Sequence, residues 1–260
     1  MIKRNPLAFF TVITFLFSWS LWLPQALYSQ GYIAVQNPVW GFGSFGPSIA
    51  GLIVIAIISG KKGLRDLGLR LLAWRVKLKW YAFIFFFPPL VILIAFLIHQ
   101  LGGGTLDAWI TAENLIMVVP TFFLILVLGG PLNEELGWRG FMLPQLLKAR
   151  GSQQAALIVG VVWAIWHLPL FWISGASQEG IPAGLVLLQI IALSYIFTWL
   201  HNRTGGSLVI PLAFHASLNT SGAVFPVLPA QAGSLQPYLI TVVLAVLFAL
   251  FLVIITRGKL

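Results

Sequence analysis

The sequence predicts an all-α, polytopic membrane protein with about eight transmembrane helices. Two observations lead to this fold class. Apolar residues make up 59% of the chain and charged residues only 8%, against about 45–50% and about 25% in soluble domains. The mean hydropathy is +0.97. A bilayer core about 30 Å thick takes about 20 apolar residues per helix, so a chain of 260 residues can hold eight spans but no second soluble domain.

Eight apolar runs are the predicted spans. They cover residues 7–27, 42–59, 81–101, 115–129, 154–173, 181–200, 207–226 and 237–256. A further stretch, 132–147, follows the break at Gly129-Gly130-Pro131 and is predicted to continue the fourth helix. We therefore expect residues 1–260 to form a single integral-membrane domain.

The basic residues define an orientation. When the connections between the predicted spans are assigned alternately to the two sides, 14 of the 15 Lys and Arg residues lie on one side, and the opposite connections contain none. The positive-inside rule then places both termini in the cytoplasm. The net charge of +9 is thereby explained by topology, so we expect no nucleic-acid partner. The expected location is the plasma (inner) membrane, as a multi-pass protein with the lipid bilayer as its surroundings.

The connection at residues 60–80 carries seven of these basic residues among leucines and two tryptophans. Such a mixture is typical of an amphipathic segment on the inner leaflet, although a plain solvated loop is the alternative. The chain contains no cysteine, which excludes thiol nucleophiles, disulfides and thiolate metal sites.

A few polar residues remain at membrane depth after the surface charges are assigned. They are Glu134, Glu135, Arg139, His167, His215 and Asn219. A charged side chain at the centre of a membrane helix costs about 2.5–3.5 kcal/mol, so it indicates function by default. Glu135 and Arg139 are four residues apart, in the favourable order for an ion pair on one helical face. Glu134 is left as the spare carboxylate and the candidate general base.

Three of these residues are predicted to lie at a similar depth on three different helices. Glu134, His167 and His215 are each 12–14 residues from the predicted cytoplasmic ends of their helices, which corresponds to roughly 18–21 Å at about 1.5 Å per residue. If the helices adjoin, the three side chains converge just beyond the middle of the membrane. Trp163 lies one turn before His167, and Asn219 one turn after His215.

The same segments resemble a known family. Residues 134–139 match the motif E-E-x-x-x-R, residues 163–167 match [F/W]-x-x-x-H, and residues 215–219 match H-x-x-x-N. In this order they resemble the CPBP family of intramembrane metalloproteases, also called the CAAX protease, bacteriocin-processing or Abi family, which includes the type II CAAX prenyl endopeptidases. The resemblance covers about residues 131–219. It implies an intramembrane endopeptidase in which Glu134, His167 and His215 are essential and Asn219 assists, with Glu135, Arg139 and Trp163 in support.

The residues leave two mechanisms open. Glu134 with His167 can activate a water molecule while His215 and Asn219 stabilise the oxyanion. Alternatively, Glu134, His167 and His215 form the two-histidine, one-carboxylate ligand set of a catalytic divalent metal such as zinc. The expected substrate is a membrane-associated peptide or protein, including a prenylated CAAX-type one. The non-enzymatic alternative is a transporter, or a bacteriocin-immunity or binding protein, that uses the same buried polar cluster. The sequence gives no oligomeric state.

Overall fold

The computed structural model describes residues 2–104 and 111–260, and every regular element in these two ranges is helical. The prediction of an all-α fold is therefore confirmed. The α-helices are α1 (Pro6–Ser29), α2 (Gly46–Leu71), α3 (Leu78–Leu101), α4 (Ala112–Leu128), α5 (Pro131–Gly137), α6 (Leu143–Ala149), α7 (Ser152–Trp166), α8 (Ala183–Arg203), α9 (Val209–Val224), α10 (Pro229–Ala232) and α11 (Gln236–Ile255). Short turns of other helix types cover Trp40–Phe45, Trp138–Met142 and Leu168–Trp172.

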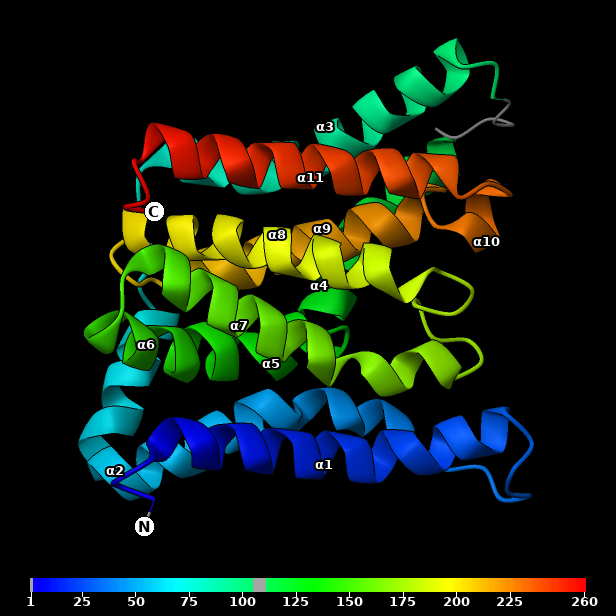
Figure 1. Cartoon of the computed structure of the whole chain (residues 1–260). Helices are drawn as coiled ribbons and strands as arrows, with labels where there is room; N and C mark the ends of the chain where they lie inside the picture. The colour runs from blue at the N-terminus through cyan, green and yellow to red at the C-terminus, as the bar shows by residue number, and fades with distance from the viewer. Residues whose placement is uncertain (1, 105–110) are drawn as a thin grey trace.

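The long helices lie side by side in layers, as Figure 1 shows. Helices α1 and α2 pack against each other on one side, and α3 and α11 pack together on the opposite side. Helices α5, α7, α8 and α9 lie between them, with α2 against α5, α7 against α8, and α3 against α9. The three segments that carry the motifs are consequently in the interior of the bundle.

Fewer helices than the predicted eight are long enough to cross a membrane by themselves. In residues 2–104 and 111–260, six helices are long and apolar enough, or seven if α4 and the bent segment 131–149 are counted as one span. Helix α9, predicted as the seventh span, has 16 residues and is therefore about 24 Å long, which is shorter than the hydrocarbon core. The chain is an integral, multi-pass membrane protein, but the count of eight spans is not confirmed.

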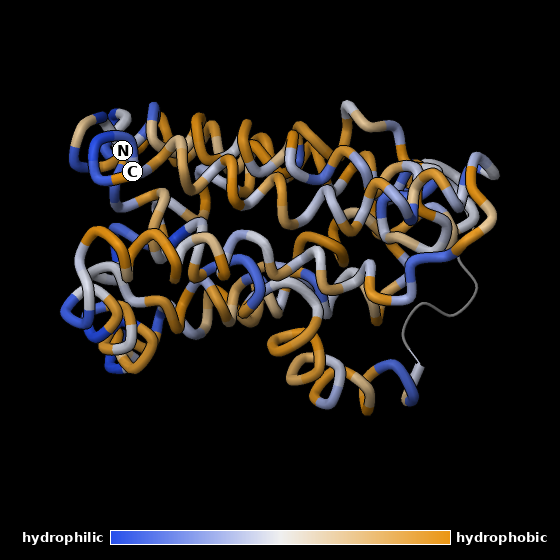
Figure 2. The backbone as a smooth tube through the Cα atoms, turned by 90° about the horizontal axis from the view of Figure 1, so that it is seen from below, coloured by the Kyte–Doolittle hydropathy of each residue, from blue (hydrophilic) through white to orange (hydrophobic). Residues whose placement is uncertain are grey.

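Both termini lie at the same end of the bundle, which we call the termini end (Figure 1). Figure 2 shows hydrophilic segments gathered there and mostly hydrophobic segments along the middle of the helices. The predicted second span ends next to Gly60, whose φ of 58° interrupts α2 before the helix continues to Leu71. Which side of the membrane this end faces, and how the connection 60–80 meets the lipid, stay predictions.

The break at Gly129-Gly130-Pro131 sets the direction of α5, the helix that carries Glu134. Helix α4 ends at Leu128, Gly130 has a φ of 114° that favours glycine, and Pro131 is the first residue of α5. The two helical segments on either side of this break are bent by 45°. The predicted continuation of the fourth helix is therefore a bent one, and the bend turns Glu134 into the interior.

Candidate active site

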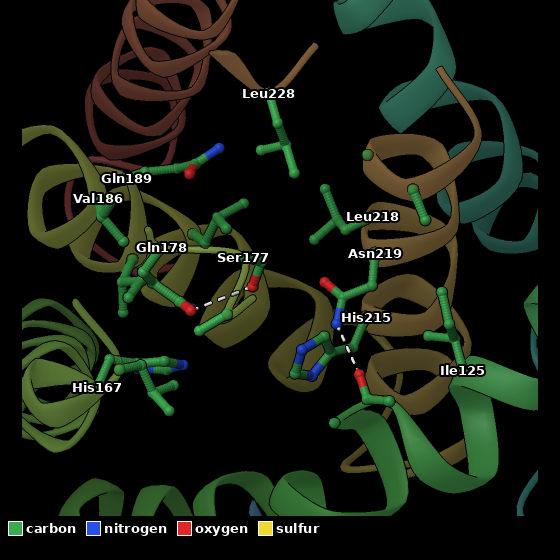
Figure 3. A pocket seen from close by; sticks show the side chains of 18 of the residues that line it. Ile125, His167, Ser177, Gln178, Val186, Gln189, His215, Leu218, Asn219 and Leu228 are labelled. Carbon is green, nitrogen blue, oxygen red and sulfur yellow. Dashed lines mark hydrogen bonds between the residues drawn. The ribbon is translucent and has the colours of Figure 1, made fainter. Parts of the chain in front are cut away.

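The three motif segments line one cavity, as the sequence predicted. Glu134 on α5, Trp163 and His167 at the end of α7, and His215 and Asn219 on α9 all border a cavity of about 640 Å³. Figure 3 shows His215 and Asn219 on one wall and His167 across from them. Glu134, His167 and His215 therefore share one cavity, but they do not converge on one point as the sequence predicted, because His167 lies across the cavity from His215.

The depth estimate for His215 rests on a helical rise that the structure does not have. It counted the rise of residues 204–208 as helical, but these residues form a turn, and His215 lies only six residues into α9. The turn itself is packed into the bundle, where Ser207 and Leu208 are buried. Helix α9 thus starts inside the protein, so even a helix of 16 residues brings His215 to the cavity.

Two tryptophans hold the carboxylate of Glu134. The indole Nε1 of Trp163 donates to Oε2 of Glu134 at 2.6 Å, and Nε1 of Trp138 donates to the same oxygen at 3.3 Å. Oε1 remains available on the cavity side. Trp163 was predicted as a supporting residue, whereas Trp138 was missed. The signal for Trp138 was its position four residues after Glu134, on the same helical face.

His215 is oriented by the neighbouring carboxylate. Its Nδ1 lies 2.8 Å from Oε1 of Glu135, and the same oxygen accepts a hydrogen bond from Arg139 at 2.9 Å. We assign a proton to Nδ1 because an ionised carboxylate can only accept. Nε2 is then left for the cavity, where it accepts when the ring is neutral and donates when the ring is protonated. The predicted Glu135–Arg139 ion pair is present, but sequence reasoning missed that Glu135 also positions His215.

His167 is held through its own backbone. It follows the last residue of α7, and its Nδ1 lies 2.8 Å from the carbonyl oxygen of Trp163. Because a carbonyl oxygen only accepts, Nδ1 carries the proton and Nε2 is free to act in the cavity. A 3₁₀ turn containing Pro169 follows directly, so the helix cannot continue past this histidine.

Glycine at position 130 leaves a small polar space beside these groups. A methyl group built on Gly130 would lie 2.9 Å from Oε1 of Glu134, 3.3 Å from Nδ2 of Asn219 and 3.5 Å from Nε2 of His215. Nδ2 of Asn219 also donates to the carbonyl oxygen of Gly129 at 2.9 Å (Figure 3). Three polar atoms from two helices therefore lie close together beside Gly130. A water molecule bound in this polar space can form hydrogen bonds to groups of both helices.

The proposed metal ligands do not form a compact ligand set. Within residues 2–104 and 111–260, no group of three His, Asp or Glu side chains is close enough to hold a metal ion. Glu134, His167 and His215 share the cavity, but His167 lies across it from His215 (Figure 3). In this conformation, the donor set does not fit a three-ligand catalytic zinc site.

Arg139 and Arg70 close the site on the side of the termini end. The guanidinium of Arg139 is fully buried and lies 4.4 Å from the ring centre of Trp163 and 3.9 Å from that of Phe197. Arg70, at the end of α2, donates to the carbonyl oxygens of Arg139, Gly140 and Gly206. Arg70 was counted only as a surface charge in the sequence. The residues next to Arg70 in the sequence gave no sign of these hydrogen bonds, which link the segment after α5 to the turn before α9.

This combination defines a class of protein. A bundle of membrane helices in which a carboxylate, two histidines and an amide line one cavity has the features of an intramembrane hydrolase. Residues 116–221, which contain all seven predicted site residues, match the family model described as type II CAAX prenyl endopeptidase Rce1-like. The chain is also similar to a protein of Methanococcus maripaludis named CAAX prenyl protease 2. The two are 28% identical over 229 residues, which cover 84% of this chain and 83% of the relative.

The chain is similar to the Rce1-like family over residues 116–221 and is a membrane-embedded peptidase. The resemblance predicted from the three motifs is confirmed. The enzyme interpretation is confirmed as well, against the transporter and immunity-protein alternatives.

Proposed function

We propose that this peptidase is an endopeptidase that cleaves a membrane-associated protein with a water molecule activated by Glu134. The observation that carries the proposal is the point beside Gly130 where polar atoms of Glu134, His215 and Asn219 meet. A base and two hydrogen-bond donors around one small space are what the addition of water to a peptide carbonyl requires.

The reaction can be followed atom by atom. Glu134, through Oε1, takes a proton from the water molecule, which His167 helps to orient through Nε2. The water oxygen forms a bond to the carbonyl carbon, and the oxyanion accepts hydrogen bonds from Nδ2 of Asn219 and from Nε2 of protonated His215. The carbon–nitrogen bond then breaks, and Glu134 returns the proton to the leaving amine. Glu135 acts through His215 as a positioning residue.

The cavity lining indicates the substrate class. Most lining residues are apolar or aromatic, and the described lining contains no Lys, Arg or Asp, with Glu134 as its one acidic residue. A site of this kind favours an apolar chain or an uncharged, hydrophobic peptide segment. Because the relative in Methanococcus maripaludis is named a CAAX prenyl protease, prenylated CAAX-type peptides are the first substrates that we propose to test.

The direct test is a cleavage assay with purified protein. A panel of quenched fluorescent peptides would carry a farnesyl group, a geranylgeranyl group or an apolar membrane anchor, each next to the same cleavable segment. We expect hydrolysis of at least one lipid-bearing or membrane-anchored peptide and none of the same segment without an anchor. Equal cleavage of anchored and free peptides would contradict the proposed substrate class.

We expect Asn219→Ala to lower kcat by roughly 10²–10³-fold with little change in KM, the usual effect of losing one oxyanion donor. The reason is that Nδ2 of Asn219 faces the point where the oxyanion forms, and the ground-state substrate does not need this contact. Steady-state kinetics on the best peptide of the panel would measure both constants. A rise in KM at unchanged kcat would instead assign Asn219 to substrate binding.

The proposed mechanism uses no metal ion, so we expect full activity after treatment with a membrane-permeant chelator such as 1,10-phenanthroline. The control is the non-chelating isomer 1,7-phenanthroline at the same concentration. Metal content of the purified protein would be measured in parallel. Loss of activity with the chelator alone, reversed by adding stoichiometric zinc or cobalt, would replace this mechanism with the metal-dependent one.

A further inference from the structure

A polar group lies on the wall that α8 contributes to the cavity. The lining residues of α8 are Val186, Gln189, Ile190 and Leu193, whose spacing places them on one face of the helix. Gln189 is polar and the other three are apolar. Figure 3 shows the amide of Gln189 extending into the cavity, on the opposite side from Asn219. A polar side chain on an otherwise apolar wall is the kind of group that fixes the orientation of a bound ligand.

The amide of Gln189 is held in one orientation by Tyr238 of α11. The hydroxyl of Tyr238 donates a hydrogen bond to Oε1 of Gln189 at 2.6 Å. Tyr238 is buried, so its hydroxyl proton needs an acceptor within the protein. Because the amide oxygen is used in this way, the amide nitrogen Nε2 is left for the cavity. In the part of the chain that the structure describes, no group accepts a hydrogen bond from Nε2.

The position of Gln189 along α8 sets its distance from the catalytic groups. The ring centre of Phe197 lies 5.8 Å from the ring centres of both Trp163 and His215. Gln189 precedes Phe197 by eight residues, which is about 12 Å along the helix at about 1.5 Å per residue. An extended peptide spans about 3.3–3.6 Å per residue. A substrate with its scissile bond at Glu134 therefore reaches Gln189 with roughly the third or fourth residue from that bond.

The chemistry of the cavity indicates which kind of atom Nε2 binds. An amide nitrogen only donates, so its partner is an acceptor such as a carbonyl or carboxylate oxygen. The described lining contains no Lys or Arg, and an uncharged peptide carbonyl can bind without leaving a charge unpaired in the cavity. The carboxylate at the end of a peptide chain presents the same kind of oxygen.

We propose that Gln189 is a substrate-binding residue whose Nε2 donates a hydrogen bond to a carbonyl-type oxygen of the substrate, three to four residues from the scissile bond. This inference rests on the proposed function and adds a length requirement to its substrate class. The oxygen belongs to a backbone peptide group or to the terminal carboxylate, and a substrate too short to present it binds more weakly. Tyr238 acts through Gln189 as a positioning residue.

The test compares the double variant Gln189→Met/Tyr238→Phe with Tyr238→Phe alone. Methionine has nearly the length of glutamine but no N–H group, and the shared Tyr238→Phe change avoids a buried hydroxyl without an acceptor. The substrates are the best peptide of the panel and analogues in which a trans-alkene replaces one peptide bond at a time on either side of the scissile bond. Each alkene removes one carbonyl oxygen without adding charge. A last analogue lacks only the terminal carboxyl group.

We expect the double variant to have a KM roughly 3–10-fold above that of Tyr238→Phe on the intact peptide, the usual effect of one neutral hydrogen bond, with kcat unchanged. For one analogue the two proteins should have equal KM values. An alkene in that role would assign the bound oxygen to a backbone carbonyl, and the analogue without the carboxyl group would assign it to the terminal carboxylate.

Two results would overturn the inference. The first is an equal KM of the two proteins on the intact peptide, or the same KM ratio for every analogue, because neither depends on an oxygen of the substrate. The second is a fall in kcat at unchanged KM. Gln154→Met is the matched control, because Gln154 is exposed at the start of α7 and outside the cavity lining. We expect it to keep the wild-type KM on every peptide.

A failure of the proposed function would look different. The wild-type protein would then cleave no peptide of the panel, whereas fluorescence anisotropy with labelled peptides would still compare the dissociation constants of the two variants. A ratio of roughly 3–10-fold that disappears for one analogue would support the role of Gln189 without cleavage. Absence of both cleavage and binding would overturn the two proposals together.

Discussion

Glu134→Gln is expected to lower kcat by roughly 10²–10⁴-fold, the range for losing a general base, while the protein stays folded. The amide oxygen of glutamine can still accept the hydrogen bonds that Trp138 and Trp163 donate, so the packing around position 134 is kept. An amide cannot take the proton from water. Steady-state kinetics would measure the loss, and thermal unfolding in detergent would show that the fold is unchanged.

The matched control is Glu135→Gln, which removes the same charge one residue away. This change removes the charge partner of the fully buried Arg139 and should lower the unfolding temperature as well as the activity, since a buried charge without its partner is strongly destabilising. Activity of Glu134→Gln within a few-fold of the wild type would show that another group is the base.

Gly130→Ala is the second substitution with a large expected effect. The new methyl group would lie 2.9 Å from Oε1 of Glu134 and would crowd the space beside this oxygen, where we place the attacking water. We expect cleavage to fall by roughly 10²–10³-fold, comparable to the loss of an oxyanion donor. The φ of 114° at this position adds a destabilisation of about 1–3 kcal/mol, because side chains other than hydrogen are strained there.

Gly184→Ala is the control for this substitution. Gly184 is at the start of α8, and a methyl group built there meets no atom within 4 Å. Comparing the two variants at a temperature where both are folded separates blocking of the site from loss of stability. A folded Gly130→Ala protein with wild-type kcat would show that the water is activated elsewhere.

The sequence predicted the apolar helices, and it predicted that the motif residues share one cavity, because both depend on local patterns. Hydropathy alone locates each apolar run, and the spacing of Glu135 and Arg139 fixes an ion pair within one helix. Once the three helices that carry the motifs pack next to one another, the motif residues line the same cavity. The sequence could not show that α9 is too short to span the membrane, since an apolar run does not reveal where a helix starts.

Contacts between distant segments were the part that could not be predicted. Arg70 is separated from Arg139 by 69 positions along the chain, and its role depends on how α2 packs against the helix of Glu134. The contact between Glu135 and His215 depends in the same way on how α5 packs against α9. The space beside Gly130 required both the backbone conformation of that residue and the positions of two side chains from α9.

Trp163 touches nearly every group that the mechanism uses. Its indole nitrogen binds Glu134, its carbonyl oxygen holds His167, and its ring lies 5.7 Å from the ring of His215 and 4.4 Å from the guanidinium of Arg139. Residues that share such a neighbour are energetically coupled. The free-energy effects of single substitutions at these four positions will therefore not add, and their separate contributions can be assigned only with double-mutant cycles that include Trp163.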